Sequence, residues 1–299
     1  MELFPFSLST LFGAVLTTIP HLATYPLGRA KLLVQNQGGL ITHGNQPYQG
    51  GIDCLKRIVK DEGVLSLWKG SQALFVTNLV GQTLTNLTIL IVTTPAIKNA
   101  HFSKDLGLFG NIGVAGMIAA RNLRNTQVRS LFLYPLQNAR IRLTTDVLTL
   151  NKERHYKGVR DVFSQIIRSS GLIGLYKGYE LYLIQSYAYR AIYFALQSML
   201  RPTVLEIFGE SMFVKFVLAN VVTLIAGACT YPIQTLGNRV MMTPGKITLS
   251  TSYDILKDIL ENEGWQSLFQ GVGLSLAFGI TDGIVNQLFQ SLLSSLLEG

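Results

Sequence analysis

The sequence is short of charged residues. Only 14% of its 299 residues are Asp, Glu, Lys or Arg, compared with about 25% in an average soluble domain. Hydrophobic residues make up 48% of the chain, and its net charge is +8. This combination excludes a disordered chain and argues against an ordinary soluble enzyme. It matches a membrane protein with basic loops better than a nucleic-acid-binding protein, which needs a continuous basic stripe.

Cysteine and histidine are also scarce, and no two of them have the spacing of a metal site. The full set is Cys54, Cys229, His21, His43, His101 and His155. Their separation excludes a disulfide framework and a zinc site, so we expect isolated side chains and no metal. The sequence also lacks a nucleophile–base pair and a glycine-rich phosphate loop, and we therefore do not expect an enzyme.

The first 13 residues contain neither the basic region of a signal peptide nor the Arg-rich amphipathic pattern of a presequence. We therefore expect any targeting information to be internal.

What the sequence does contain is a series of long apolar segments. A bilayer core of ~30 Å is crossed by about 20 apolar residues in a helix. Six segments of about this length or longer have few charges: Leu3–Leu27, Ser71–Ile97, Leu106–Leu136, Leu181–Leu200, Phe213–Ile233 and Val272–Leu297. The sequence therefore predicts an all-α membrane protein with six transmembrane helices and both termini on the same side.

An internal repeat organises these segments. Tyr-Pro occurs near the ends of three of them, at Pro26, Pro135 and Pro232, and an aromatic-x-Gly triplet follows each one, at residues 68–70, 176–178 and 269–271. Between each proline and its triplet lies a short amphipathic stretch, such as GIDCLKRIVKDEG, with Ile52, Leu55, Ile58 and Val59 at helical spacing. We expect each stretch to be a short helix at the membrane surface. The predicted repeats cover residues 1–100, 101–202 and 203–299.

These three in-phase motifs resemble the signature of the mitochondrial carrier family, P-x-[DE]-x-x-[KR]-x-[KR] followed by [DE]-G-x4-[WYF]-[KR]-G. Segments such as YPLGRAKLLVQNQ and TYPIQTLGNRVMM are most similar to those of the ADP/ATP carriers. The resemblance implies a pseudo-threefold barrel of six helices in the mitochondrial inner membrane. The three prolines would kink helices at one end of this barrel, and a purely structural role for them is equally compatible with the sequence.

Two rings of ion pairs that gate transport in the family lack their acids here. The positions that correspond to the matrix gate are Gly28, Lys31, Gln137, Arg140, Gln234 and Gly237. The positions that correspond to the cytosolic gate are Leu90, Thr93, Ser198, Arg201, Gln290 and Leu293. A charge at membrane depth is tolerated mainly when it is paired, so neither ring can close through salt bridges. Hydrogen bonds from Gln137 and Gln234 would close the inner ring more weakly, at about 1 kcal/mol each.

The resemblance also identifies former substrate positions. Lys or Arg binds the nucleotide in the ADP/ATP carriers where this chain has His21, Thr77, Asn238 and Phe278, and the neighbouring pocket positions are Gln185, Ser186 and Tyr189. Phosphate groups need fixed cationic donors. We therefore expect the chain not to bind or exchange nucleotides.

The family also binds cardiolipin at helix N-termini, and the residues for this are largely retained. They are Tyr48, Gly50, Trp68, Lys69, Gly70, Tyr156, Gly158, Tyr176, Lys177, Gly178 and Gly271. The third triplet, Phe269-Gln270-Gly271, has lost its cation, so we expect two good lipid sites and one weak one. A role of the glycines as helix caps alone is the alternative.

Three arginines in the third apolar segment have no counterpart in the family pattern. Arg121, Arg124 and Arg129 have the spacing of one helical face, and Asp282 is the only acid well inside another segment. This face either binds a partner or lines a watery cavity.

The loss of both gates and of the binding cations predicts a transport-inactive accessory subunit of a larger inner-membrane complex, such as a respiratory complex. The alternative is a working solute carrier with a different, non-nucleotide substrate that uses Gln185, Ser186, Tyr189 and the arginines. The three loops after the prolines carry net charges of +3, +5 and −1, and they hold 17 of the 25 basic residues. These loops are therefore predicted to face the matrix.

Overall fold

The computed structural model describes residues 8–38, 47–88, 129–147, 155–243 and 251–298. The chain divides into two compact units, one of Met1–Ile19 with Gln72–Gln137 and one of Pro20–Ser71 with Asn138–Gly299. The described part of the chain is helical and contains no strand.

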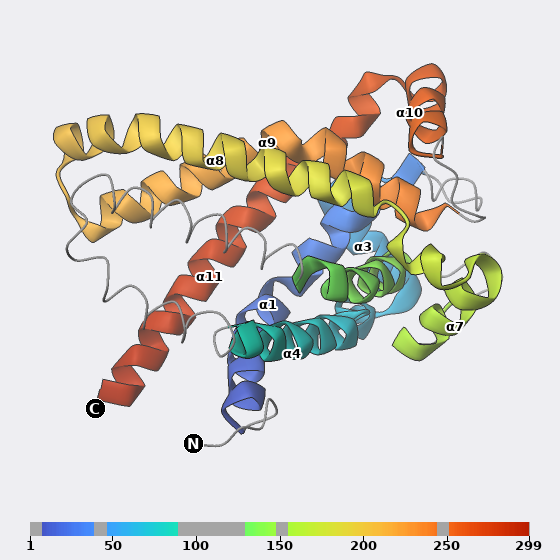
Figure 1. Cartoon of the computed structure of the whole chain (residues 1–299), viewed down its shortest axis with the longest axis horizontal. Helices are drawn as coiled ribbons and strands as arrows, with labels where there is room; N and C mark the ends of the chain where they lie inside the picture. Colours follow the sequence, from blue (N-terminus) through green and yellow to red (C-terminus); the bar gives the residue numbers. More distant parts are fainter. Residues whose placement is uncertain (1–7, 39–46, 89–128, 148–154, 244–250, 299) are drawn as a thin grey trace, which may run out of the picture. The chain divides into compact units, whose positions relative to one another are not determined.

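The predicted repeat appears as the same order of elements three times (Figure 1). The first copy consists of α1 (Leu8–Gln35), α3 (Gly51–Glu62), the 3-10 turn η1 (Val64–Trp68) and α4 (Ser71–Thr88). The second consists of a helix over residues 129–145, α7 (Val159–Ser170), η4 (Leu172–Tyr176) and α8 (Tyr179–Phe208). The third consists of α9 (Met212–Met242), α10 (Thr251–Asn262), η5 (Trp265–Phe269) and α11 (Val272–Glu298).

The long helices extend beyond the apolar segments that predicted them. The segment predicted at Leu3–Leu27 continues as α1 to Gln35, and the one predicted at Phe213–Ile233 continues as α9 to Met242. Both helices run through their prolines, Pro26 and Pro232. Hydropathy marks where a helix leaves an apolar environment, whereas the backbone hydrogen bonds continue until a cap or a turn interrupts them. Residues 89–97 and most of the segment predicted at 106–136 lie outside the described residues.

Two of the helices have the length and hydropathy of membrane spans in the described chain. Stretches within Met212–Met242 and Trp265–Ser295 reach mean hydropathies of 2.0 and 1.4, and only 17% and 0% of these stretches are buried. Phe213, Val217, Val221 and Ile225 form an exposed stripe at four-residue spacing along α9. Ile280, Ile284, Leu288 and Leu292 form an equivalent stripe along α11. Exposed apolar stripes of this length are surfaces for lipid.

The three predicted short helices form, and only one side of α3 is buried. Cys54 and Ile58 are buried against Ala30, Leu33 and Val34 of α1. Ile52 and Val59, by contrast, are exposed. The buried face therefore follows an i, i+4 spacing, since only one narrow side of this short helix touches α1. In α7 the same spacing buries Val162 and Ile166.

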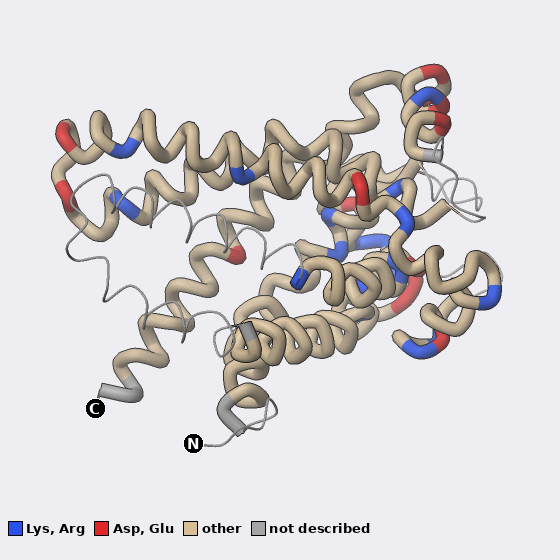
Figure 2. Tube along the Cα trace, in the orientation of Figure 1, with Lys and Arg blue, Asp and Glu red and all other residues tan. Residues whose placement is uncertain are grey.

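Charged residues are concentrated on these surface helices. Figure 2 shows them on α3, α7 and α10, and it shows few along α9 and α11. Helices α8 and α9 pack side by side as a hairpin joined by a short turn at Gly209 (Figure 1).

Candidate functional site

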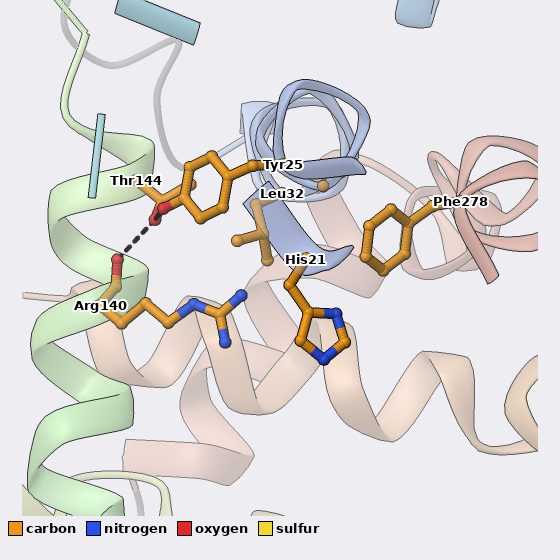
Figure 3. A pocket seen from close by; sticks show the side chains of 7 residues that line it. His21, Tyr25, Leu32, Arg140, Thr144 and Phe278 are labelled. Carbon is orange, nitrogen blue, oxygen red and sulfur yellow. Dashed lines mark hydrogen bonds between the residues drawn. The ribbon is translucent and has the colours of Figure 1, made fainter. Parts of the chain in front are cut away.

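A small pocket lies in the larger unit, among α1, the helix of residues 129–145 and α11. It contains about 280 Å³ of space not filled by protein atoms, part of it open to solvent. Its lining residues are His21, Tyr25, Gly28, Leu32, Arg140, Thr144 and Phe278. Figure 3 shows the Arg140 guanidinium extending toward the side of α1 that carries His21. The pocket thus brings together two former gate positions and two former substrate positions.

His21 is bound to an acid that the sequence did not pair with it. Its Nδ1 lies 2.9 Å from Oδ1 of Asp282 in α11. Since an ionised carboxylate only accepts hydrogen bonds, this contact assigns the imidazole proton to Nδ1. Thr24 donates to the same oxygen at 2.7 Å, and Asn286 donates to Oδ2 at 3.2 Å. Asp282 is therefore held by three side chains around the pocket.

The matrix-gate positions in this unit contain no ion pair among the described residues. The ammonium group of Lys31 lies 5.8 Å from the centroid of the Phe278 ring. A β-carbon added at Gly28 would lie 3.2 Å from that same ring. Phe278 therefore occupies space next to both positions, and a larger residue at position 28 would displace it. Among the described residues, the Gln137 and Gln234 side chains have no hydrogen-bond partner.

The other former substrate positions are turned toward the protein. The buried Asn238 donates to Oε1 of Gln35 at 3.2 Å, and Gln35 in turn donates to Thr235 at 3.0 Å. In the smaller unit, Thr77 donates to the backbone carbonyl of Ala73 at 2.7 Å. These polar groups form their hydrogen bonds within the protein, so few of their donors and acceptors remain for a nucleotide. Gln185, Ser186 and Tyr189 lie half-buried on α8, and the Tyr189 ring stacks on Tyr193 at 6.2 Å.

The cytosolic-gate positions and the arginine face are only partly described. Leu90, Thr93, Arg121 and Arg124 lie outside the described residues. Ser198 bonds to its own helix through the Ala195 carbonyl, and Arg201 and Gln290 are exposed, whereas Leu293 is half-buried. Arg129 lies beside α4, where a β-carbon at Gly81 would be 3.3 Å from its guanidinium.

The Tyr-Pro and aromatic-x-Gly motifs bond to each other. Tyr25 donates its hydroxyl proton to the backbone carbonyl of Lys69 at 3.0 Å. In the third repeat, Tyr231 donates to the carbonyl of Gln270 at 2.8 Å. Each tyrosine thus ties the end of one long helix to the start of the next, which explains why the two motifs recur in step.

The residues predicted to bind lipid fall into two groups. Gly70, Gly178 and Gly271 have φ values of +89, +78 and +80°, which strongly favour glycine. Gly50 and Gly158, by contrast, are extended, and an added β-carbon would have nothing within 4 Å. The first group is therefore required by the backbone itself, whereas the second faces open space at the start of a surface helix.

The two triplet lysines point into the protein. Lys69 bonds to the Asp146 carboxylate at 2.6 Å, and Lys177 is buried and donates to the Thr243 carbonyl at 2.8 Å. Burial lowers the pKa of Lys177. The two ammonium groups are therefore already bonded within the protein. The backbone N–H groups of the motif are the donors that are available to a lipid phosphate. The indole of Trp68 similarly donates to the Leu22 carbonyl at 2.7 Å.

Three ion pairs tie the helix ends to the loops. Arg29 lies 3.0 Å from Glu62, Lys69 lies 2.6 Å from Asp146, and Arg239 lies 2.7 Å from Glu263. Arg29 is fully buried and also donates to the carbonyls of Ser66 and Thr144. The sequence did not reveal these pairs, because each joins positions at least 24 residues apart.

The surface helices α3 and α7 hold further groups with shifted pKa values. The backbone N–H groups of Gln49 and Lys157 hold the pKa values of Asp53 and Asp161 below their usual range. Burial raises the pKa of the Cys54 thiol to about 12, so this cysteine is an unreactive core residue. The described residues contain no group of three or more His, Cys, Asp or Glu side chains that would hold a metal ion.

Comparison with known proteins agrees with this architecture. The family model of the mitochondrial carrier protein matches the chain three times, over residues 3–93, 113–207 and 209–299. ADP,ATP carrier protein 1 of Gossypium hirsutum is 35% identical over 282 residues, which are 91% of this chain and 70% of that protein. The ADP,ATP carrier protein of Neurospora crassa is 33% identical over 299 residues, covering 96% and 92% of the two chains. ADP,ATP carrier protein 3 of Saccharomyces cerevisiae is 33% identical over 298 residues, covering 96% and 93%. The chain is therefore a member of the mitochondrial carrier family, with that family's all-α fold of six transmembrane helices in three repeats.

Proposed function

We propose that this chain is a transport-inactive, ADP/ATP-carrier-like protein that serves as an accessory subunit of a larger mitochondrial inner-membrane complex. The observation that carries this proposal is the composition of the matrix-gate ring. Lys31 and Arg140 remain there, but Gly28, Gln137 and Gln234 stand where acids are needed. Because the ring has no acid, it cannot form the salt bridges that form and break during transport.

The nucleotide cations are lost independently of the gates. His21 bonds to Asp282, Asn238 to Gln35 and Thr77 to the Ala73 carbonyl, so three of the four positions have internal partners. At the fourth position, an aromatic ring, Phe278, stands beside Lys31 in place of a cation. The Asp282 carboxylate beside His21 and the missing cations both disfavour a nucleoside triphosphate.

The scaffold, by contrast, is intact. The exposed apolar stripes of α9 and α11 support insertion in the membrane, and the buried Arg29–Glu62 pair supports a well-packed loop region. A chain that keeps its membrane-type helices and its loop ion pairs while losing its transport residues suits a structural role. The partner faces in this proposal are the lipid-exposed helix surfaces and the arginine face of Arg121, Arg124 and Arg129.

We further propose that the basic loops face the matrix and that cardiolipin binds beside them. Their net charges of +3 and +5 in the first two repeats favour anionic lipid. The open space over Gly50 and Gly158 leaves room for a headgroup.

Two experiments test this function. Purified protein in liposomes loaded with ADP is expected to show no inhibitor-sensitive exchange with external ATP, while a homologous ADP/ATP carrier in matched liposomes does. On a native gel of mitochondria, the chain is expected to migrate with a complex far larger than its own 33.0 kDa. Nucleotide exchange, or migration as a free monomer, contradicts the proposal.

A second candidate is a solute carrier with a different substrate, and the pocket beside Arg140 favours it. Uptake of a non-nucleotide solute by the same liposomes, abolished by Arg140→Gln, would support this candidate over the first.

A further inference from the structure

The middle residue of each aromatic-x-Gly triplet contacts a neighbouring repeat. The contacts are Lys69 with the Asp146 carboxylate at 2.6 Å, Lys177 with the Thr243 carbonyl at 2.8 Å, and Gln270 with the Gln37 amide at 3.4 Å. Each partner is the eleventh residue after the proline of its own Tyr-Pro pair, and all six residues lie in the larger unit. The contacts therefore join the first repeat to the second, the second to the third and the third to the first. We call these six residues the triplet ring.

The three junctions of the triplet ring differ in strength. Lys69 and Asp146 form an ion pair whose side chains are 13% and 3% exposed. Lys177 places a buried ammonium group on a neutral carbonyl. Hydrogen bonds with a charged partner are about twice as strong as those between neutral groups. The bond from Gln37 to Gln270 is neutral and longer than a usual N–H···O bond, so the junction between the third and first repeats is the weakest.

The hydrogen bonds next to the ring follow the same order. At the first two junctions an arginine donates to a carbonyl of the next repeat: Arg29 to Thr144 at 3.2 Å, and Arg142 to Met241. At the third junction the neighbouring bonds join neutral side chains: Gln35 to Thr235 at 3.0 Å, and Asn238 to Gln35 at 3.2 Å. The third junction thus lacks the charged donors of the other two at this end of the helices.

One charged contact between the first and third repeats lies away from the ring. His21 of α1 bonds to Asp282 of α11 at 2.9 Å. Asp282 follows Gln270 by 12 residues, which is roughly 18 Å along a helix. This bond fixes α1 to α11 at a distance from the ring, so a separation of the two repeats begins at the ring itself.

We propose that the triplet ring holds the three helix ends together where the gate ion pairs are missing, and that it opens first at its junction between the third and first repeats. The gate positions Gly28, Gln137 and Gln234 supply no acid at this end of the helices. This inference goes beyond the proposed function and does not depend on it. A transporter would have to break the same contacts that an accessory subunit keeps.

The chain contains a natural reporter for this opening. Cys54 of α3 is fully buried, and Val147 of the second repeat and Leu274 of the third pack against the cluster that contains it. Its thiol therefore becomes accessible when the first or the third junction opens. Val162 is the equivalent position of α7 and is also fully buried. By the symmetry of the repeats, a cysteine there reports the first and second junctions.

The test measures thiol labelling of the purified full chain under native conditions in detergent. Cys229→Ser removes the exposed cysteine from every variant. Cys54 is expected to be labelled at least ten times faster than the cysteine introduced by Val162→Cys in a Cys54→Val background. Global unfolding exposes both positions together. Equal labelling rates would therefore mean that the ring does not open locally, and would overturn the proposal.

A graft of the ion pair onto the third junction tests the cause. Gln37→Glu with Gln270→Lys is expected to slow the labelling of Cys54 at least tenfold and to leave the introduced cysteine unchanged. The glutamate keeps the acceptor for the Tyr48 backbone N–H, which Gln37 binds at 2.9 Å. Lys257→Gln is the control, because Lys257 lies in an exposed pair on α10 and should change neither rate.

A milder variant keeps the test decisive if the grafted pair impairs folding. Gln270→Ala removes the neutral contact and should speed the labelling of Cys54 alone. Unchanged labelling in this variant, or equal slowing by Gln270→Lys without the glutamate, overturns the inference. Nucleotide exchange in liposomes would contradict the proposed function but would leave the order of the junctions standing.

Discussion

At the scale of single residues, glycines with the same place in the motif pattern have different reasons to be there. Gly70 has φ of +89°, and a β-carbon would lie 2.7 Å from both the Thr144 and Tyr25 hydroxyl oxygens. Gly50 is extended and has open space around it. The first glycine is therefore a requirement of the fold, and the second is available for contact with another molecule.

Replacing Gly70 with Ala is expected to destabilise the protein by about 2 kcal/mol or more, because a strained φ and a steric clash add together. Thermal unfolding in detergent measures the change. Gly50→Ala is the control and should shift stability by less than about 0.5 kcal/mol. If Gly70→Ala and Gly50→Ala lowered stability equally, the hydrogen bond from Tyr25 to Lys69 would not restrict the residue at position 70.

Replacing Lys69 with Gln tests the buried pair with Asp146. The Asp146 side chain is only 3% exposed, so loss of the ammonium group leaves a buried carboxylate without its ion partner. We expect a loss of about 3 kcal/mol, as is typical when one partner of a buried pair is removed. Lys257→Gln on α10 is the control, because Lys257 and Glu261 form an exposed pair at 3.7 Å that contributes little.

At the scale of elements, α3 and α7 begin in the same way. Asp53 accepts the Gln49 backbone N–H at 3.0 Å, and Asp161 accepts that of Lys157 at 2.9 Å. In both helices the acid lies in the first turn, where the helix dipole also favours negative charge. The repeated stretch Tyr-x-Gly-x-x-Asp is thus a helix start in two of the three repeats.

These hydrogen bonds predict that the starts of α3 and α7 lose stability at low pH. They lower the folded-state pKa values of Asp53 and Asp161, so the stability that the two carboxylates contribute is fully present above the unfolded pKa of about 3.9. It is lost as the pH falls through the lower folded pKa values. Hydrogen exchange of the first turns of α3 and α7 between pH 6 and pH 3 should show decreasing protection. The double variant Asp53→Asn, Asp161→Asn should show a smaller decrease, and the exposed Glu261→Gln should behave like the wild type.

At the scale of the whole molecule, the three repeats are alike in fold but unequal in charge. The first two loops are basic, whereas the third carries net −1 and has Gln270 where the other triplets have lysine. Electrostatic attraction to anionic lipid should follow this difference.

Native mass spectrometry of the purified protein is therefore expected to show two tightly held cardiolipins and a third that dissociates readily. Gly158→Leu, which fills the open space at the start of α7, should remove one of the two without lowering the unfolding midpoint. Three lipids of equal retention would contradict the proposed inequality of the repeats.

Much of this architecture was predictable from local patterns. The apolar segments, the three surface helices and the missing gate acids depend on residue type and spacing along a few tens of residues. The sequence did not say which apolar positions of α3 are buried, because amphipathic spacing alone does not say how wide the buried side of a helix is, and Ile52 and Val59 are exposed. The helix ends were also underestimated, since apolar composition and backbone hydrogen bonding stop at different places.

The sequence by itself determined the family, the repeat and the loss of the transport residues, because all three follow from motifs at fixed spacing. Only the tertiary structure decided the contacts of the pocket. His21 and Asp282 are 261 residues apart, and Lys31 meets Phe278 across the same two helices. Which residues satisfy a charge inside the protein depends on how distant segments pack, and no local pattern contains that information.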